Sequence, residues 1–227
     1  MTGLEVLYRE LALPGNWQLG SGQRTIWAPR CPKHLDRPGF RDAGSYMGHA
    51  IDPVFAVSIL DERATPIQAR AMERNWNPAR LELKYSLPSA LITERRAILS
   101  YDTFISQWTI THSANISQYY WLVLWTRRPD GIAERRISDI EANPRGASFQ
   151  ESVIDSEGNE KTKWGCALGA NFDADSWSVN GAESAGADVT WSATPFLDLM
   201  APGGLPGHLP QHESADGHLF FALAYPF

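Results

Sequence analysis

The sequence of 227 residues predicts an all-β protein, a large antiparallel β-sandwich of two sheets with at most short helices. Residues 107–112 alternate between polar side chains and Trp108, Ile110 and His112, and this period of two is typical of a half-buried strand. Residues 119–125 are apolar on both faces, so this strand must be covered on both sides. The chain has no sustained helical period and no internal repeat.

The first half of the chain begins with an irregular stretch in which proline and glycine recur at short intervals. Alternation is clearest further on, where Leu81, Leu83 and Tyr85 share one face of a predicted strand. Residues 67–74 fit either a helical turn or a strand, and both alternatives stay open. The predicted strands of this half are Leu4–Leu11, Thr25–Ala28, Ile51–Leu60, Ala79–Leu87 and Leu91–Leu99.

The second half opens with the segment Thr93–Thr126, which we predict to be two adjacent strands with a polar break at Ser113–Ser117. Residues 133–140 fit a short helix or a strand. The closing Leu219–Phe227 is apolar on both faces, so we expect either a central strand or a continuation into another domain. A meander of about twelve to sixteen strands favours a sandwich over a small barrel. The other strands are Phe149–Ile154 and Lys161–Ala170, as a hairpin, then Trp177–Asn180, Val189–Ser192 and Phe196–Met200.

Composition narrows the class of protein. The length suits one large domain or two small ones, and we predict a single β-sandwich domain over residues 1–227, which a longer enzyme could contain as its N-terminal part. A net charge of −6 argues against nucleic acid as a partner, and no apolar stretch is long enough to cross a membrane. Because Glu5, Arg9 and Glu10 interrupt the region where a signal peptide has its apolar core, we expect a cytoplasmic protein.

Cys31 and Cys166 are expected to be free thiols without a catalytic role.

Tryptophan is the unusual residue of this chain, with nine copies. Some of these side chains must lie in the hydrophobic core, and packing in the core is the favoured interpretation for all nine. Surplus tryptophans can also stack on the apolar face of a sugar ring. Trp17, Trp27 and Trp76 lie in loop-rich sequence, and they are the candidates for contact with carbohydrate or with a partner domain.

The loop Ala201–His218 concentrates residue types that bind metals. Three imidazoles near a carboxylate are the composition of a zinc or non-haem iron site. Pro210 opposes the helix that would bring two of these histidines together, so no metal or other cofactor is predicted. A loop with incidental histidines is favoured, and a polar lid over a neighbouring cleft is the alternative. The residues concerned are His208, His212, Glu213, Asp216 and His218.

Other charged residues have structural interpretations. Asp173, Asp175 and Glu183 cannot be placed opposite one another across a scissile bond, so a solvated acidic surface is favoured and no catalytic residue is assigned. The arginines 127–128 and 135–136 have acidic neighbours, which favours a solvated edge or a domain contact. Adjacent strand residues Arg95 and Arg96 must point to opposite faces, where one of them could pair with a carboxylate.

Three consecutive segments carry a resemblance to a known family. Residues 84–88 read as a polar residue, Tyr, one residue, Leu and Pro. Residues 93–99 read Thr-Glu-Arg-Arg-Ala-Ile-Leu, and residues 101–110 read Tyr-Asp-x-x-x-Ser-x-Trp-x-Ile. This pattern resembles the N-terminal super-sandwich domain, galactose-mutarotase-like in fold, of (α/α)6-barrel glycoside hydrolases and phosphorylases, the glycogen-debranching-like or six-hairpin glycosidase group. The upstream residues 40–46 and 52–57 and the closing strand fit the same outline.

The resemblance implies a non-catalytic domain, because in that family the two catalytic carboxylates lie on the barrel. The sandwich domain packs on the barrel, in cis or in trans, and shapes the rim of its cleft. Two other hypotheses stay open. One is a stand-alone carbohydrate-binding β-sandwich. The other is a β-sandwich enzyme that uses the histidine loop, either metal-dependent or mutarotase-like. Self-association into a homo-oligomer also stays open.

Overall fold

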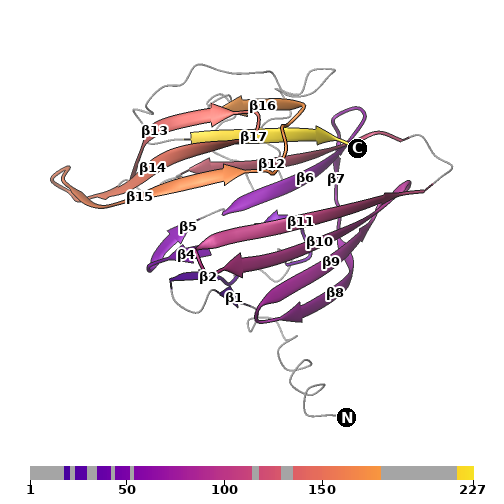
Figure 1. The fold of residues 1–227 in the computed structure, drawn as a ribbon, viewed down its shortest axis with the longest axis horizontal. Helices are drawn as coiled ribbons and strands as arrows, with labels where there is room; N and C mark the ends of the chain where they lie inside the picture. The colour runs from indigo at the N-terminus through magenta and orange to yellow at the C-terminus, as the bar shows by residue number, and fades with distance from the viewer. Residues whose placement is uncertain are drawn as a thin grey trace, which may run out of the picture. The chain divides into compact units, whose positions relative to one another are not determined.

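The computed structural model describes residues 18–20, 24–29, 35–41, 44–51, 54–113, 118–128, 135–179 and 219–227. These residues form seventeen strands in four sheets whose pairings are antiparallel, and they contain no helix (Figure 1). The predicted class, an all-β antiparallel sandwich, is therefore confirmed, although the strands divide among four sheets rather than two. No helix in this described part has the length and apolarity that crossing a bilayer requires.

The chain divides into two compact units, each built from two separate segments. The first unit comprises Met1–Val57 and Gln68–Gln118, and the second comprises Ser58–Ile67 and Tyr119–Phe227. The border runs through one strand, β6 (Phe55–Asp61), whose first three residues belong to the first unit. The prediction of a single domain over the whole chain stays a prediction.

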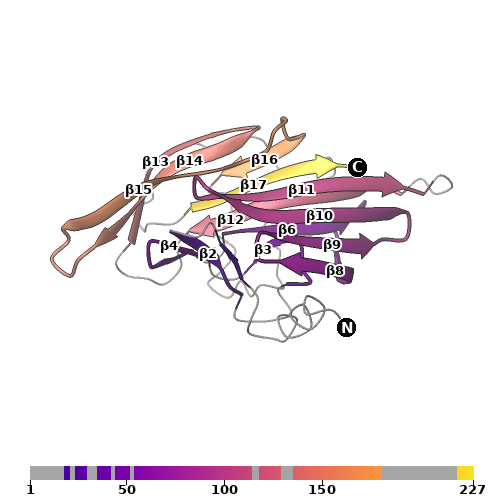
Figure 2. The same cartoon turned by 60° about the horizontal axis from the view of Figure 1, so that its bottom comes forward.

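The first unit contains two four-stranded sheets. One sheet has the order β1-β2-β4-β5, and the other has the order β11-β10-β9-β8. The second is built on a long hairpin, in which β10 and β11 pair without a register shift from Ala90–His112 to Leu99–Thr103; Figure 2 shows its four strands side by side. The strands are β1 (Leu19–Gly20), β2 (Thr25–Trp27), β4 (Gly44–Tyr46), β5 (His49–Ile51), β8 (Ala71–Asn77), β9 (Arg80–Ser86), β10 (Ala90–Leu99) and β11 (Thr103–His112).

An aromatic cluster forms the core of this unit around Phe40. Its ring meets the rings of Trp27, Phe55 and Phe104 edge to face, at centroid distances of 5.1, 5.3 and 5.2 Å. These rings come from four different strands, since Phe40 lies on the short strand β3 (Gly39–Phe40), which pairs with Phe55 and Ala56 of β6. Edge-to-face packing of this kind adds stability beyond the apolar area that it buries.

The second unit contains a sheet of order β16-β17-β12-β6, with β7 paired to β6, and a three-stranded sheet of order β13-β14-β15. Ile137 and Phe149 of the small sheet share a buried cluster with Val179, Phe221 and Leu223 of the large one. The two sheets therefore pack face to face, which is the layer arrangement of a sandwich. The strands are β7 (Pro66–Ile67), β12 (Tyr120–Arg128), β13 (Arg135–Asn143), β14 (Gly146–Ile154), β15 (Glu160–Gly169), β16 (Ser176–Val179) and β17 (Leu219–Pro226).

The strand that is apolar on both faces is central, as predicted. β12 lies between β17 and β6, and Val123 and Trp125 are buried. Both alternatives between helix and strand resolve to strands, because residues 66–67 and 71–74 belong to β7 and β8, and residues 135–140 to β13. The predicted strands Leu4–Leu11, Val189–Ser192 and Phe196–Met200 lie outside the described residues.

Candidate functional site

A fully buried ion pair occupies the middle of the first unit. Glu94 and Arg96 stand two residues apart on β10, so they point to the same face, and the side chains of both are 0% exposed. Their neighbours on that face, Ile92 and Ile98, are apolar and buried. The alternation of the strand thus places two opposite charges in the core. Each charge would be unfavourable there without the other.

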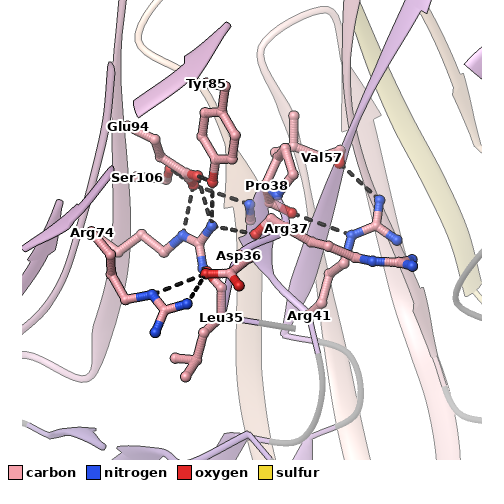
Figure 3. Close-up of polar contacts among 12 residues, drawn as sticks. Leu35, Asp36, Arg37, Pro38, Arg41, Val57, Arg74, Tyr85, Glu94 and Ser106 are labelled. Atoms are coloured by element: carbon pink, nitrogen blue, oxygen red, sulfur yellow. Dashed lines mark hydrogen bonds and ion pairs between the residues drawn. The ribbon is translucent and has the colours of Figure 1, made fainter. Parts of the chain in front are cut away.

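The carboxylate of Glu94 receives hydrogen bonds from four directions (Figure 3). Arg96 donates through Nε to Oε1 at 2.9 Å and through Nη2 to Oε2 at 2.7 Å, which is a bidentate pair. Tyr85 on β9 donates its hydroxyl to Oε2 at 2.7 Å, and Ser106 on β11 donates its hydroxyl to Oε1 at 2.6 Å. The backbone N–H of Gly39 also donates to Oε1, at 3.0 Å. Side chains of three adjacent strands and the backbone of β3 therefore meet at one carboxylate.

The guanidinium of Arg96 reaches beyond this carboxylate to the segment that precedes β3. It donates to the backbone carbonyls of Leu35, at 3.5 Å, and of Arg37. The same group donates from Nη2 to the hydroxyl oxygen of Tyr85 at 2.9 Å and lies 5.6 Å from the ring centroid of Trp27. Arg96 therefore ties the segment 35–41 to the sheet of β8–β11.

Electrostatics keep this pair charged. Burial alone would raise the pKa of Glu94, but the charge and hydrogen bonds of Arg96, with those of Ser106 and Tyr85, outweigh it and leave that pKa below the usual value. Burial likewise opposes the charge of Arg96, whose pKa is nevertheless raised by Glu94. Burial, reinforced by the charge of Glu94, raises the pKa of Tyr85 well above that of a free tyrosine. Tyr85 is thus a neutral hydrogen-bond donor to a carboxylate.

Two further arginines fix the position of residues 35–41, one from within the segment and one from strand β8. Arg41 donates from Nε to the carbonyl of Pro38 at 3.3 Å and from Nη2 to the carbonyl of Val57 at 2.9 Å. Burial, together with the charges of Arg37 and Arg96, lowers the pKa of Arg41 to about 10, so it remains protonated at neutral pH. On the surface, Arg74 donates from Nε to Asp36 at 2.9 Å. We call residues 35–41 with these contacts the arginine-clamped segment.

A second buried carboxylate lies in the second unit. Glu151 is 0% exposed and receives a hydrogen bond from Nη1 of Arg135 at 2.7 Å, with Nε of Arg128 at 3.9 Å. The thiol of Cys166 lies 3.9 Å from Oε2 of Glu151, and the guanidinium of Arg135 lies 6.0 Å from the ring centroid of Trp164. Burial first, and the charge of Glu151 second, raise the pKa of Cys166 to about 11. The thiol is therefore protonated at neutral pH, as expected for a cysteine without a catalytic role.

Neither carboxylate is arranged to meet a substrate. Glu94 and Glu151 have no exposed surface, and each is engaged by a guanidinium. General acid or base catalysis needs hydrogen-bond reach to a reacting group, which sealed side chains do not have. In the part of the chain that the structure describes, no three histidine, cysteine or acidic residues gather as a metal site would require. These clusters hold strands together.

The tryptophan candidates have different surroundings from those predicted. Trp27 lies on β2, is 1% exposed and donates its indole N–H to the carbonyl of Arg41 at 3.0 Å. Trp76 lies on β8 and is 7% exposed. Each therefore faces the interior from a strand, as the predicted strand Thr25–Ala28 allows for Trp27, and contact of either residue with carbohydrate or a partner domain stays a prediction. Trp17 lies outside the described residues.

The histidine loop also lies outside the described residues. This applies to His208, His212, Glu213, Asp216 and His218, and to Glu183, so the structure does not test the metal and lid interpretations. Asp173 and Asp175 are exposed, as expected, and Asp173 accepts a hydrogen bond from Nε of Arg145 at 2.6 Å. The structure does not bring these two residues into the buried clusters.

The structure agrees with one of the two predictions about arginines and contradicts part of the other. Arg95 and Arg96 do point to opposite faces, with Arg95 paired at the surface to Glu82 at 2.6 Å and Arg96 paired in the core. The solvated edge expected for arginines 127–128 and 135–136 is wrong for Arg128 and Arg135, because both side chains are only 7% exposed and both face Glu151. The carboxylate that draws them inward lies on another strand, β14, which spacing along the sequence does not reveal. The alternative of a domain contact stays a prediction.

Sequence reasoning missed the two buried carboxylates themselves. A signal for both was present, since Glu94 alternates with Ile92 and Ile98, and Glu151 stands two residues after Phe149. A charge on the apolar face of a strand requires a buried partner. Comparison with protein-family models and with curated protein sequences gave no match for the chain.

Proposed function

We propose that this chain is a non-catalytic β-sandwich domain of a carbohydrate-active enzyme, a glycoside hydrolase or phosphorylase. In this role it packs on an (α/α)6 catalytic barrel, in cis or in trans, and shapes the barrel's cleft. The proposal combines the resemblance of the segment 79–125 with the behaviour of its residues in the structure. The substrate binds to the barrel, and the sandwich supplies a rigid wall.

One observation carries the proposal. Each of the three segments on which the resemblance depends contributes to the same buried network: Tyr85 from the first, Glu94 and Arg96 from the second, and Ser106 from the third. The pattern therefore has a physical cause, which is the mutual satisfaction of buried polar groups across three strands. A pattern that serves internal bonding suits a supporting domain better than a catalytic one.

The charges support the same role. A buried ion pair contributes little net stability against a well-packed apolar core, but a shifted register of β9 or β11 would take the hydroxyl of Tyr85 or Ser106 away from the buried carboxylate of Glu94. A sheet held in one register presents its edges and loops in fixed positions. That is the property required of a domain that borders another domain's cleft.

The test is to identify the barrel and to measure what this chain does for it. The natural coding sequence around residues 1–227 and the adjacent reading frames should encode an (α/α)6 barrel, which is then produced with and without this chain. We expect release or phosphorolysis of sugar to fall at least about tenfold without the chain, since loss of a supporting domain misplaces substrate. Absence of any such barrel from the locus, or full activity without the chain, would refute the proposal.

Two further measurements separate the alternative hypotheses. Retention of the isolated chain on polysaccharide affinity gels would favour a stand-alone carbohydrate-binding protein. Stoichiometric bound metal that is lost in the His208→Ala and His212→Ala variants would favour a metal-dependent enzyme. Under the proposal, the isolated chain neither binds metal nor turns over sugar.

A further inference from the structure

The free edge of strand β11 differs from every other sheet edge in the described residues. Backbone N–H and C=O groups along such an edge are a template for another strand, and proteins usually protect them by short strands, charges, prolines or bulges. β1, β3, β5, β7 and β16 are two to four residues long. β8, β13 and β15 are longer, and each has a register shift against its neighbour and carries charged residues.

β11 has none of these protections. Its residues Thr103–Thr111 read TFISQWTIT, without a charge or a proline, and they pair with β10 without a shift. The apolar residues Phe104, Trp108 and Ile110 are half-buried, while Gln107 and the threonines are exposed. A long, flat, uncharged edge is the kind that accepts a partner strand.

The hydrogen-bond pattern shows which groups face this edge. The N–H of Ser113 donates to the carbonyl of Ser89 at 2.8 Å, so the odd-numbered residues of β11 exchange hydrogen bonds with β10. The N–H and C=O groups of the even-numbered residues point the other way. Within Thr103–Thr111, the template therefore consists of the backbone groups of four residues: Phe104, Ser106, Trp108 and Ile110.

We propose that the β11 edge is a self-association surface, on which a second copy of this chain adds its own β11 in antiparallel orientation. A two-fold axis at Gln107 aligns the four even-numbered residues for hydrogen bonding: Phe104 of one copy with Ile110 of the other, and Ser106 with Trp108. An aromatic residue opposite a β-branched residue is a favourable cross-strand pair. The inference is independent of the proposed function.

Charge favours a second copy as the occupant. Antiparallel pairing about Gln107 sets no like charges opposite each other, because Thr103–Thr111 has no charged side chain. On the exposed face of the paired strands, Thr103 of one copy lies opposite Thr111 of the other, and the two copies of Gln107 lie opposite each other. These uncharged polar pairs are compatible with self-association.

Gln107 gives the sharpest test. It occupies a non-hydrogen-bonded pair on the proposed axis, where Cα atoms approach to about 4.5 Å. Sedimentation equilibrium of the wild-type chain, up to roughly 100 μM, should show a dimer. Gln107→Lys and Gln107→Glu should each weaken the dimer by about tenfold or more through like-charge repulsion, and an equimolar mixture of the two should associate again. Thr93→Lys, on the same face but on β10, is the matched control and should leave the dimer intact.

Hydrogen exchange of the wild-type chain provides a measurement that needs no variant. Exchange at Phe104, Ser106, Trp108 and Ile110 should slow as protein concentration rises, while exchange in β9 stays constant. A wild-type chain that remains monomeric, a dimer that tolerates both charges, or exchange independent of concentration would each overturn the proposal.

Discussion

Ser106 donates a hydrogen bond of 2.6 Å to the carboxylate of Glu94, and this bond joins β11 to β10 inside the first unit. The bond ends at the same oxygen, Oε1, that receives the Nε–H of Arg96 and the backbone N–H of Gly39. A single carboxylate therefore joins two strands of the hairpin to the segment before β6.

Replacing Glu94 with Gln should destabilise the chain strongly. The variant leaves the guanidinium of Arg96 buried without its counter-charge, and breaking a buried pair in this way costs about 3–5 kcal/mol. Glu82→Gln removes the carboxylate of the exposed pair with Arg95 and should cost about 1 kcal/mol or less. Urea unfolding of both variants measures the difference, and equal losses would contradict a buried, coupled Glu94.

Acid should remove the advantage of the wild type over Glu94→Gln. Because the pKa of Glu94 is lower in the folded chain than in the unfolded chain, its contribution is fully present above the unfolded value, about 4.3, and is lost as pH falls through the folded value. The difference in unfolding free energy between the two proteins should therefore be constant from pH 7 to 6 and shrink below about pH 4. Urea titrations at several pH values test this, and an unchanged difference at acidic pH would argue against an ionised Glu94.

Adding a methyl group at Gly39 should cost much more than adding one at Gly48. Both glycines have positive φ angles, 82° and 84°, so alanine is strained at either position. At Gly39 the new Cβ would also lie 2.7 Å from the backbone N of Val57, whereas nothing lies within 4 Å at Gly48. We expect Gly48→Ala to cost about 1 kcal/mol and Gly39→Ala at least about 2 kcal/mol. Thermal unfolding of both variants measures the difference between them. That difference reports the close approach to Val57, because the strain of alanine at a positive φ angle is common to both variants.

Cys166 should react slowly with thiol reagents in the folded chain. Since burial raises its pKa to about 11, the reactive thiolate is scarce at pH 8, and labelling should be at least about tenfold slower than in urea. A Cys31→Ser variant leaves Cys166 as the labelled thiol, and Cys166→Ser serves as the reverse control. Labelling of native Cys31→Ser at the unfolded rate would refute a buried, protonated thiol.

Local patterning was sufficient to predict several of the strands, although Thr93–Thr126, predicted as two strands, contains parts of three, β10, β11 and β12. The alternation in 79–87 and 107–112 and the apolar run 119–125 each correspond to a strand, because period and burial are properties of neighbouring residues. The number of sheets could not be predicted in this way. Which strands pair across long intervals, such as β12 with β17, depends on tertiary packing, as does the division into two units.

The site residues were harder to predict for a related reason. Trp27 looked available because proline and glycine surround it, yet it packs against Phe40 from a distant part of the sequence. Arg128 and Arg135 looked solvated because their nearest neighbours in sequence are polar, while the residue that draws them inward, Glu151, lies on another strand. The partner of a buried charge depends on which strands pair across long intervals of sequence. A single sequence shows only that a charged residue occupies a position on the apolar face of a strand.

The interleaved order of the two units has a consequence during synthesis on the ribosome. Residues 58–67 belong to the second unit but emerge before the whole of 68–118, which completes the first. At roughly 5–20 residues per second, the apolar end of β6 must wait several seconds for β12 to appear. Throughout that interval Ile59 and Leu60 have no native neighbour strand other than the two-residue β7. The nascent chain therefore exposes the apolar end of β6 to chaperones, and to misassembly, while its first unit is being completed.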